Sequence, residues 1–473
     1  MASFALIAVA AAVIFVGQTT YDQEPPPTTM RTAATSNSTE RAPATSMVLE
    51  DPHFAPIEVA AQEEIDAGHI PGAVVLVGHQ GRVVYRKAFG QRFLEPRPQP
   101  MTVETIFDLS SLTKVVATTT AIMQLSDRNL LSIDDPVAKY WPEFGQKGKA
   151  CLTLRQLLTH TSGLQEGINP RAHWSDYQGA LGAIAGDRLL KPPGTEFRYS
   201  DVNFIVLGEL VRRVSGQPLD VYCTEKIFKP LKMWQTSFKP PRNWQAHIAP
   251  CNVLKGRLRW GEVQDPTAYR LGGVAGHAGV FSTADDLAVF AQMLLDGGES
   301  RGERILSLGA VVAMTKPQSI AGSPILRGLG WDIQSRFAQE FNASFPAGSF
   351  GHTGYTGTSI WIEPRSKTYL IILTNQLHPS GKRQVKTLRA KIAAAVAAAV
   401  PMGPAAGVSG LGGISLDASR EQSVNLMKLL NNYGENRQAE PDLGKVEKGS
   451  SGRRLWSKSC PGLTGLPLPK RGG

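Results

Sequence analysis

The chain has 473 residues, 42% of them hydrophobic, so it can build a large core and is not a disordered or fibrous protein. Its formal net charge of +10, from 50 basic and 40 acidic side chains, raises the question of a nucleic-acid or membrane partner. Four widely separated cysteines exclude a disulfide-dense scaffold, and neither they nor the nine histidines have the spacing of a metal site.

The chain opens with an apolar stretch. Residues 5–17 carry no charge; the stretch is too short to span a membrane but has the length of a signal-peptide core, although no Lys or Arg precedes it. We therefore take residues 1–22 as a signal-like leader. We expect export to the periplasm or the extracellular space, with membrane contact only through an uncleaved leader. Residues 23–51 are rich in Pro, Thr, Ser and Ala and have the composition of a linker.

The next segments predict a hairpin and a helix. Residues 73–78 and 83–89 are apolar and β-branched runs on either side of a turn that contains Gly81, which predicts two antiparallel strands. Residues 108–125 predict a helix that Asp108 or a serine caps. Ser111 and Lys114 lie three residues apart and share one face of that helix. A neighbouring amine can take the serine proton if burial keeps its pKa low, but S-x-x-K is also common by chance.

The second half of the chain adds helices and then strands. Residues 282–295 have a cap-like start, an apolar face with helical spacing and two terminal glycines. Residues 357–364 and 368–374 predict two strands, and residues 382–400 an Ala-rich helix. Strands near both ends with helices between them predict an α+β protein, in which an antiparallel sheet is flanked by helices and a mostly helical domain is inserted.

The C-terminal extension, residues 401–473, is rich in Gly and Ser, and we expect it to be disordered. It carries ten Lys and Arg against six Asp and Glu, so it supplies two-fifths of the net charge. The remaining surplus is spread thinly over about 400 residues, and the charge therefore does not indicate a nucleic-acid partner.

Two further motifs follow Ser111 and Lys114 in the chain. They are Tyr199-Ser200-Asp201 and His352-Thr353-Gly354. The three motifs, in this order and spacing, resemble those of the penicillin-recognising serine hydrolases: S-x-x-K, Y-x-N, and K-T-G or H-x-G. The closest resemblance is to class C β-lactamases, family VIII carboxylesterases and D-alanyl-D-alanine peptidases. It covers residues 52–400, with further matching segments at 154–164, 193–200 and 276–287.

The resemblance implies a β-lactamase/transpeptidase-like fold and a site without metal or cofactor. Ser111 would be the acylated nucleophile, and Lys114 and Tyr199 would move its proton as a coupled pair. The backbone N–H groups of Ser111 and Tyr355 would form the oxyanion hole, beside His352, Thr353 and Gly354.

Two positions depart from the family pattern. Asp201 replaces an asparagine that donates through its amide, which a carboxylate cannot do. Asp201 could instead hold Lys114, Asn203 could supply the amide, or the change could be a neutral capping substitution. His352 replaces a lysine, and a histidine of ordinary pKa is only about a quarter protonated at pH 7. We therefore expect an anionic group on the substrate to be recognised less strongly, and neutral esters to become relatively more favourable substrates.

These observations predict a serine hydrolase that acts on a small molecule, foremost a carboxylesterase on short-chain esters. The alternatives are a β-lactamase or a D-alanyl-D-alanine carboxypeptidase acting on a peptidoglycan peptide and, more remotely, a non-catalytic binding protein on the same fold. A lipase-like G-x-S-x-G at residues 298–302 follows a helix in a polar segment, so we do not assign Ser300 to a site.

Overall fold

The computed structural model describes residues 51–402, except residues 96, 255, 321 and 380–384. The predicted leader, nearly all of the linker and nearly all of the C-terminal extension lie outside the described residues, so those assignments stay predictions. In the part of the chain that the structure describes, we find no helix whose length and apolar character would let it cross a membrane.

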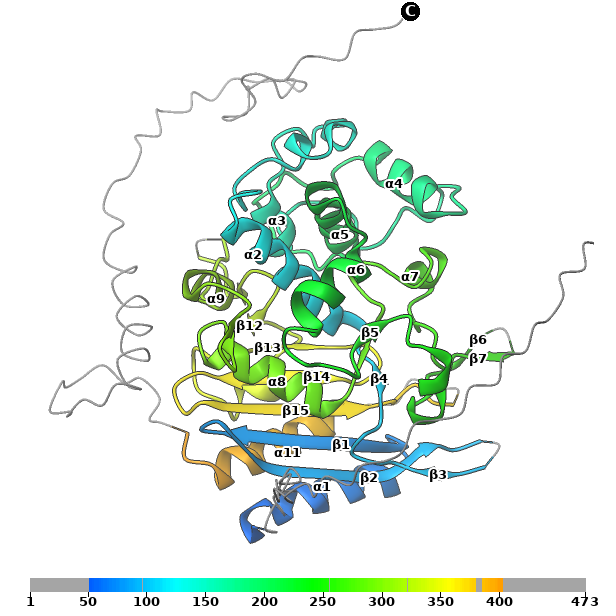
Figure 1. Ribbon diagram of the computed structural model, residues 1–473, viewed down its shortest axis with the longest axis vertical. Coiled ribbons are helices and arrows are strands. Elements are labelled where there is room, and N and C mark those ends of the chain that lie inside the picture. Colours follow the sequence, from blue (N-terminus) through cyan, green and yellow to red (C-terminus); the bar gives the residue numbers. More distant parts are fainter. Residues whose placement is uncertain (1–50, 96, 255, 321, 380–384, 403–473) are drawn as a thin grey trace, which may run out of the picture. The chain divides into compact units, whose positions relative to one another are not determined.

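One antiparallel sheet of eight strands organises the described residues (Figure 1). Its strands are β1 (Gly72–His79), β2 (Arg82–Phe93), β3 (Gln99–Pro100), β11 (Leu326–Arg327), β12 (Asp332–Gln334), β13 (Phe350–Thr353), β14 (Ser359–Glu363) and β15 (Thr368–Thr374). The order across the sheet is β11-β12-β13-β14-β15-β1-β2-β3. The N-terminal strand β1 pairs with the C-terminal strand β15, from Ala73 opposite Thr374 to His79 opposite Thr368. The prediction that both ends of the fold build the sheet is thus confirmed.

The central strand β1 is buried on both faces. Val74 and Leu76 enter one hydrophobic core, while Val75 and Val77, which point to the opposite face, enter a second core. Two residues, Gln80 and Gly81, join β1 to β2 with φ of 49° and 80°, the backbone of a tight hairpin turn.

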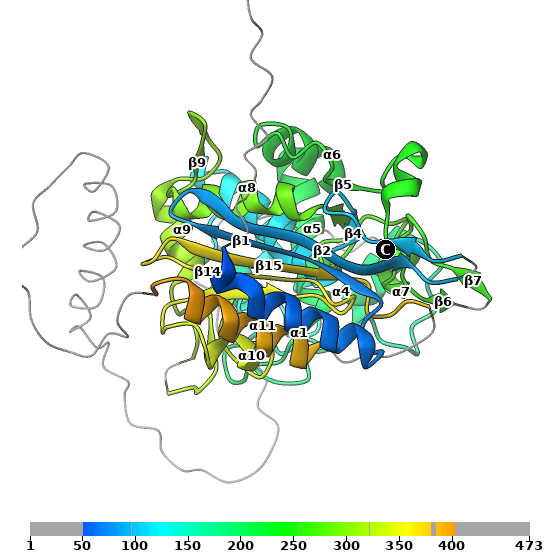
Figure 2. The same ribbon diagram turned by 90° about the horizontal axis from the view of Figure 1, so that it is seen from below.

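Helices cover both faces of the sheet. The α-helices of the described residues are α1 (Ala55–Asp66), α2 (Thr120–Asp127), α3 (Leu154–Leu158), α4 (Tyr177–Gly186), α5 (Asp201–Ser215), α6 (Leu219–Cys223), α7 (Pro266–Arg270), α8 (Ala284–Leu295), α9 (Leu308–Thr315), α10 (Gln339–Asn342) and α11 (Lys386–Ala399). Helices α1 and α11 lie side by side on one face (Figure 2). Helix α8 packs on the other face against β1 and β15, below the helical part that holds α2, α3, α5 and α6 (Figure 1).

Smaller sheets connect these parts. The strands β4 (Phe107–Asp108), β5 (Ser237–Phe238) and β8 (Val280–Ser282) form one sheet in the order β4-β8-β5. Two short hairpins consist of β6 (Val253–Leu254) with β7 (Arg257–Leu258), and of β9 (Glu299–Ser300) with β10 (Glu303–Arg304). Ser300 thus belongs to a hairpin that follows α8, where no strand leads into a nucleophile turn.

The predicted helix at residues 108–125 differs from the structure. A 3₁₀ turn covers Ser110–Leu112, a π-helical segment covers Lys114–Thr119, and regular α-helix begins only at Thr120. A π-helical segment often marks a functional site, because it rotates side chains out of the regular helical register. By contrast, α8 follows the prediction, since the Thr283 side chain accepts the N–H of Asp286 and Gly297 and Gly298 follow its end.

Candidate active site

The segment that carries Ser111 is held by a buried carboxylate. Asp108 Oδ1 accepts the N–H of Ser110 at 2.8 Å, and its Oδ2 accepts the N–H of Gln264 at 2.6 Å. Burial raises the pKa of Asp108 to about 6. Ser110 has φ of 49°, a conformation that residues other than glycine rarely adopt. The neighbouring Ser111 therefore sits on a backbone that its surroundings fix in an uncommon shape.

Lys114 is completely buried next to Ser111. Its Nζ donates to Ser111 Oγ at 3.0 Å and to the carbonyl of His277 at 3.2 Å, and it forms an ion pair with Asp201 Oδ1 at 2.7 Å. Burial alone would lower the pKa of Lys114, but the negative charge of Asp201 outweighs it, so that the pKa lies above its usual value. Proton transfer to this amine was expected only if burial kept its pKa low. The structure does not meet that condition, because Asp201 lies within ion-pair distance of Lys114.

Tyr199 is fixed against the same ammonium group. Lys114 Nζ lies 4.9 Å from the centre of the Tyr199 ring. The ring stacks on the imidazole of His160 with the ring centroids 4.5 Å apart, and it packs against the ring of Phe337 with the centroids 5.2 Å apart. His160 Nδ1 accepts the N–H of Ser200, and burial lowers the pKa of His160 well below its usual value, so this histidine acts as a neutral support for Tyr199.

The two polar residues after Tyr199 have separate partners. Asp201 contacts Lys114, as described above. Asn203 is fully buried, where its Oδ1 accepts from Ser162 Oγ at 2.6 Å and its Nδ2 lies 3.3 Å from His160 Nδ1. Of the alternatives that the sequence leaves open, the geometry therefore favours Asp201 as the partner of Lys114, while the amide of Asn203 braces the segment around Ser162.

The third motif supplies a neutral side chain. His352, on β13, is buried, and its Nδ1–H donates to the carbonyl of Thr353 at 2.9 Å. Burial, with further contributions from the charges of Arg327 and Lys114, lowers the pKa of His352 well below its usual value. His352 is accordingly uncharged at neutral pH, and the fraction of charge expected from an ordinary histidine was an overestimate.

The turn after β13 is tied to the nucleophile segment. Thr358 Oγ1 donates to the carbonyl of Leu109 at 3.0 Å, and Arg389 on α11 donates to the carbonyl of Thr358 at 2.8 Å. A Cβ at Gly354 would lie 2.2 Å from Thr358 Oγ1 and 2.6 Å from the Leu109 carbonyl oxygen. Glycine is required at this position because no side chain fits between the turn and the segment that leads to Ser111.

The N–H of Tyr355, expected in the oxyanion hole, donates to Ser110 Oγ at 3.2 Å. The residue that precedes Ser111 thus contacts the expected oxyanion donor directly, while the side chain of Tyr355 itself is exposed. An oxyanion formed at Ser111 would share this N–H with the Ser110 hydroxyl.

A cavity of about 490 Å³ opens beside Ser111. Tyr199, Phe337 and Tyr355 are its aromatic lining residues, and Lys386 and Arg389 of α11 are among its basic ones. The residues that line it are Ser111, Tyr199, Arg327, Asp332, Phe337, His352, Thr353, Gly354, Tyr355, Gln376, Val385, Lys386 and Arg389. Its volume suits a small organic substrate.

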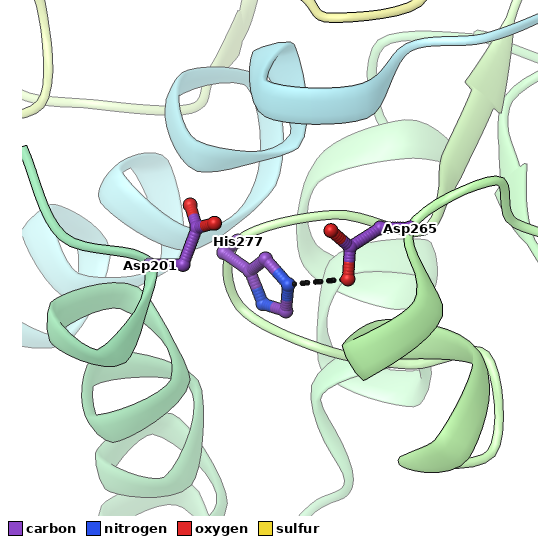
Figure 3. A group of neighbouring side chains, drawn as sticks. All are labelled: Asp201, Asp265 and His277. Atoms are coloured by element: carbon purple, nitrogen blue, oxygen red, sulfur yellow. Dashed lines mark hydrogen bonds and ion pairs between the residues drawn. The ribbon is translucent and has the colours of Figure 1, made fainter. Parts of the chain in front are cut away.

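The carboxylates of Asp201, the ion-pair partner of Lys114, and Asp265 lie close to the imidazole of His277 (Figure 3). One ligand atom of each lies within 4.8 Å of the others, and His277 Nε2 contacts Asp265 Oδ1 at 2.9 Å. The pKa of Asp265 is lowered to about 2, since the charge and hydrogen bond of His277 outweigh the effect of burial. The Lys114 ammonium already supplies positive charge beside Asp201, so we assign this group as the surroundings of Lys114 and not as a metal site.

Several residues of the site had no role in the sequence-based predictions, among them Asp265, Arg327, Asp332, Phe337 and Arg389. Arg327 and Asp332 form a buried ion pair at 2.8 Å in the wall of the cavity. Asp265 shows only the local pattern of a helix cap, because its side chain accepts the N–H of Ala268. No motif links these residues to Ser111; the tertiary packing of β11, β12, α11 and the loops brings them there.

Comparison with known proteins places the chain in a family. The profile of the "Beta-lactamase" family matches residues 57–395. The chain belongs to this family. It is accordingly a serine hydrolase of the β-lactamase/transpeptidase-like fold, as the motifs predicted.

Relatives in this family have several activities in their names. The chain is 32% identical over 353 residues to a protein of Escherichia coli K12 named "Putative D-alanyl-D-alanine carboxypeptidase", which covers 67% of this chain and 80% of the relative. It is 31% identical over 360 residues to the N-acetylmuramyl-L-alanine amidase of Bacillus subtilis 168, covering 68% and 80%. The solved structure of EstCE1, a hydrolase with promiscuous acyltransferase activity, matches with a TM-score of 0.60 and 26% identity, covering 73% of this chain and 98% of EstCE1.

Proposed function

We propose that this protein forms an acyl-enzyme on Ser111 and is a carboxylesterase that acts on short-chain esters. The observation that carries the nucleophile assignment is the 3.0 Å contact between Lys114 Nζ and Ser111 Oγ. Ser111 Oγ would attack the ester carbonyl carbon while its proton passes to the Lys114–Tyr199 pair. The bond to the alkoxy oxygen would then break, with the proton going to the alcohol, and water would release the acid from Ser111 in a second step.

The preference for a neutral ester rests on charge. His352 stands where the resembled family has a lysine, and burial keeps it neutral. The cation next to it in the wall, Arg327, is paired with Asp332. An ester with no charge near the scissile bond needs no positive partner, and the aromatic wall of Tyr199 and Phe337 suits its apolar groups.

A second candidate is hydrolysis of an amide bond in a peptidoglycan-derived peptide, including removal of a terminal D-alanine. It is supported by the names of the two curated relatives and by Lys386 and Arg389, which line the cavity and could face a carboxylate. Turnover of β-lactams would follow the same acyl-enzyme route and is an alternative within this candidate.

A substrate panel with intact-mass detection separates these candidates. Purified protein would be given p-nitrophenyl butyrate, N-acetylmuramyl-L-alanyl-D-isoglutamine, diacetyl-L-Lys-D-Ala-D-Ala and nitrocefin, with Ser111→Ala as the blank. We expect the ester to have the highest kcat/KM, a butyryl adduct at Ser111, and a loss of about 10³-fold or more in Ser111→Ala. Faster turnover of a peptide or of nitrocefin would reject the esterase proposal, and activity retained in Ser111→Ala would reject the nucleophile.

We further propose that the protein is exported through the leader at residues 1–22. The support is the uncharged apolar run at residues 5–17 and the linker composition after it. Expression of the full chain, followed by fractionation and N-terminal sequencing, tests it. A cytoplasmic product that retains Met1 would reject export.

A further inference from the structure

The side chain that approaches the Lys114 ammonium most closely is a carboxylate. Asp201 faces its Nζ from the first turn of α5, and Tyr199 lies just before that helix. The loop that carries His277 contributes a carbonyl, with Asp265 behind it at 2.9 Å from the imidazole (Figure 3). Burial keeps His160 and His352 neutral, the nearby cation Arg327 is paired with Asp332, and His277 contacts Asp265.

The ammonium of Lys114 has three close contacts in this region. Two of its N–H groups donate to Ser111 Oγ and to the His277 carbonyl, and the 2.7 Å ion pair with Asp201 is the shortest of its contacts. An ammonium group has three donors and no acceptor. While Lys114 is charged, it can orient Ser111 and stabilise a nearby anion, but it cannot take the serine proton.

Activation of Ser111 requires a further negative charge in this region. It forms either on the serine oxygen or on Tyr199, which must lose its own proton to solvent before its phenolate can take the proton of Ser111. A single ammonium would favour that charge. Asp201 already pairs with this ammonium, while Asp265, the second carboxylate nearby, is in contact with His277. An asparagine in place of Asp201, as in the resembled motif, would leave the positive charge of Lys114 available to Ser111 and Tyr199.

We propose that Asp201 is a positioning residue that pairs with the Lys114 ammonium, so that less of its positive charge acts on Ser111 and Tyr199. Asp201 thereby sets the lower pH limit at which Ser111 becomes nucleophilic. The proposal rests on Ser111 being the nucleophile of the proposed function, but not on the substrate being an ester. A carboxylate at this point makes the enzyme active at higher pH than an amide would, while the fold around it stays the same.

A test that depends on no carboxyl substrate is the rate at which Ser111 reacts with a fluorophosphonate. In that reaction Ser111 Oγ bonds to phosphorus, fluoride leaves with the electron pair of the P–F bond, and the serine proton passes to the site and then to solvent. The second-order rate constant would be measured from pH 5 to pH 10 on the full chain. Intact mass would locate the adduct, and Ser111→Ala would serve as the blank.

We plot the second-order rate constant for labelling against pH. In Asp201→Asn, we expect the midpoint of the acid limb of this profile to fall by about one pH unit relative to the unsubstituted protein. Asp201→Glu keeps the charge and should return the midpoint to within about 0.3 unit. A purely structural role would lower the rate equally at all pH values and leave the midpoint unchanged. The proposal would be overturned if the acid limb of the pH–rate profile had the same midpoint in Asp201→Asn as in the unsubstituted protein, or a midpoint at higher pH.

Asp265→Asn provides a second variant that removes a carboxylate without removing a contact of Lys114. Its midpoint should fall by less than that of Asp201→Asn, and a larger fall would contradict the role of Asp201. If Asp201→Asn does not fold, the comparison of Asp201→Glu with Asp265→Asn decides in the same way. Labelling that survives without turnover of any ester would reject the esterase activity alone. No labelling in any variant would reject the nucleophile and, with it, this inference.

Discussion

At the scale of single residues, two substitutions change the charge of the site in the same direction. Asp201 adds a negative charge where the resembled motif has an amide, and the neutral His352 removes a positive charge where it has a lysine. Both changes make the region around Ser111 less favourable for an anion. Under the proposed function, we expect their combined effect to disfavour substrates with a carboxylate beside the scissile bond.

The charge at position 352 can be restored. In His352→Lys, we expect the ratio of kcat/KM for diacetyl-L-Lys-D-Ala-D-Ala to kcat/KM for p-nitrophenyl butyrate to rise about tenfold, because an ammonium binds a carboxylate more strongly than a neutral imidazole does. Steady-state kinetics on both substrates measure the ratio. His352→Gln is the uncharged control, and an equal rise in this variant would show that size and not charge selects the substrate.

Asp108 gives a stability prediction at the same scale. Its two oxygens accept two N–H groups, those of Ser110 and Gln264. In Asp108→Asn, one of these N–H groups would face an amide NH₂, and we expect a loss of about 1 to 3 kcal/mol in the free energy of unfolding. In Asp176→Asn, the control, the side chain can still cap α4 as Asp176 does, so the change should be under about 0.5 kcal/mol.

The cost at Asp108 should also depend on pH. The folded-state pKa of Asp108 is raised to about 6, so the folded protein binds this proton more tightly than the unfolded chain does. This contribution to stability is fully present below the unfolded pKa and is lost as pH rises to about 6. Asp108→Asn has no such proton, so urea unfolding should show a larger difference from the unsubstituted protein at pH 4.5 than at pH 7.5. An equal difference at both pH values would contradict the raised pKa.

At the scale of elements, the site depends on close packing between loops and helices. The loop that ends at His277 crosses α5 at Gly276, where a Cβ would lie 1.9 Å from the carbonyl oxygen of Phe204. This approach brings the His277 carbonyl to Lys114. The position of a glycine on a helix–loop crossing therefore determines a contact of the ammonium group.

Gly276→Ala should separate the loop from α5. We expect the free energy of unfolding to fall by about 2 kcal/mol or more, and the labelling rate of Ser111 to fall with it, because the backbone must move to admit the methyl group. Thermal unfolding and fluorophosphonate labelling measure both. Gly182→Ala is the matched control on α4, where a Cβ meets nothing within 4 Å and the change should stabilise by up to about 1 kcal/mol. Similar losses in both variants would contradict the packing argument.

For the whole molecule, sequence patterns predicted the features that depend on residues close together in the chain. They did not predict the features that depend on contacts between distant residues. The β1–β2 hairpin, the strands β14 and β15 and helix α8 follow from local patterns, and the structure has all of them. Motif order predicted that Ser111, Lys114 and Tyr199 meet, and the structure brings them together. The 3₁₀ and π geometry of residues 110–119 was not predictable, because it arises from tertiary contacts. The raised pKa of Lys114 depends on Asp201, 87 residues away in the chain. The sequence left this pairing open as one of three alternatives, because no local pattern gives the distance between the two side chains.

The antiparallel sheet joins both ends of the fold, so the last helix should be essential and the chain after it dispensable. Leu388, Ile392 and Val396 of α11 are fully buried in the core that the sheet shares with α1. Burial of three such side chains contributes roughly 5 kcal/mol or more, comparable to the total stability of a domain. A chain that ends at Val385 should therefore not fold. A chain that ends at Met402 should keep its thermal unfolding temperature within a few degrees and label at Ser111 at the full rate. Circular dichroism and labelling of both chains test this, and loss of folding in the longer one would show that residues 403–473 are part of the folded enzyme.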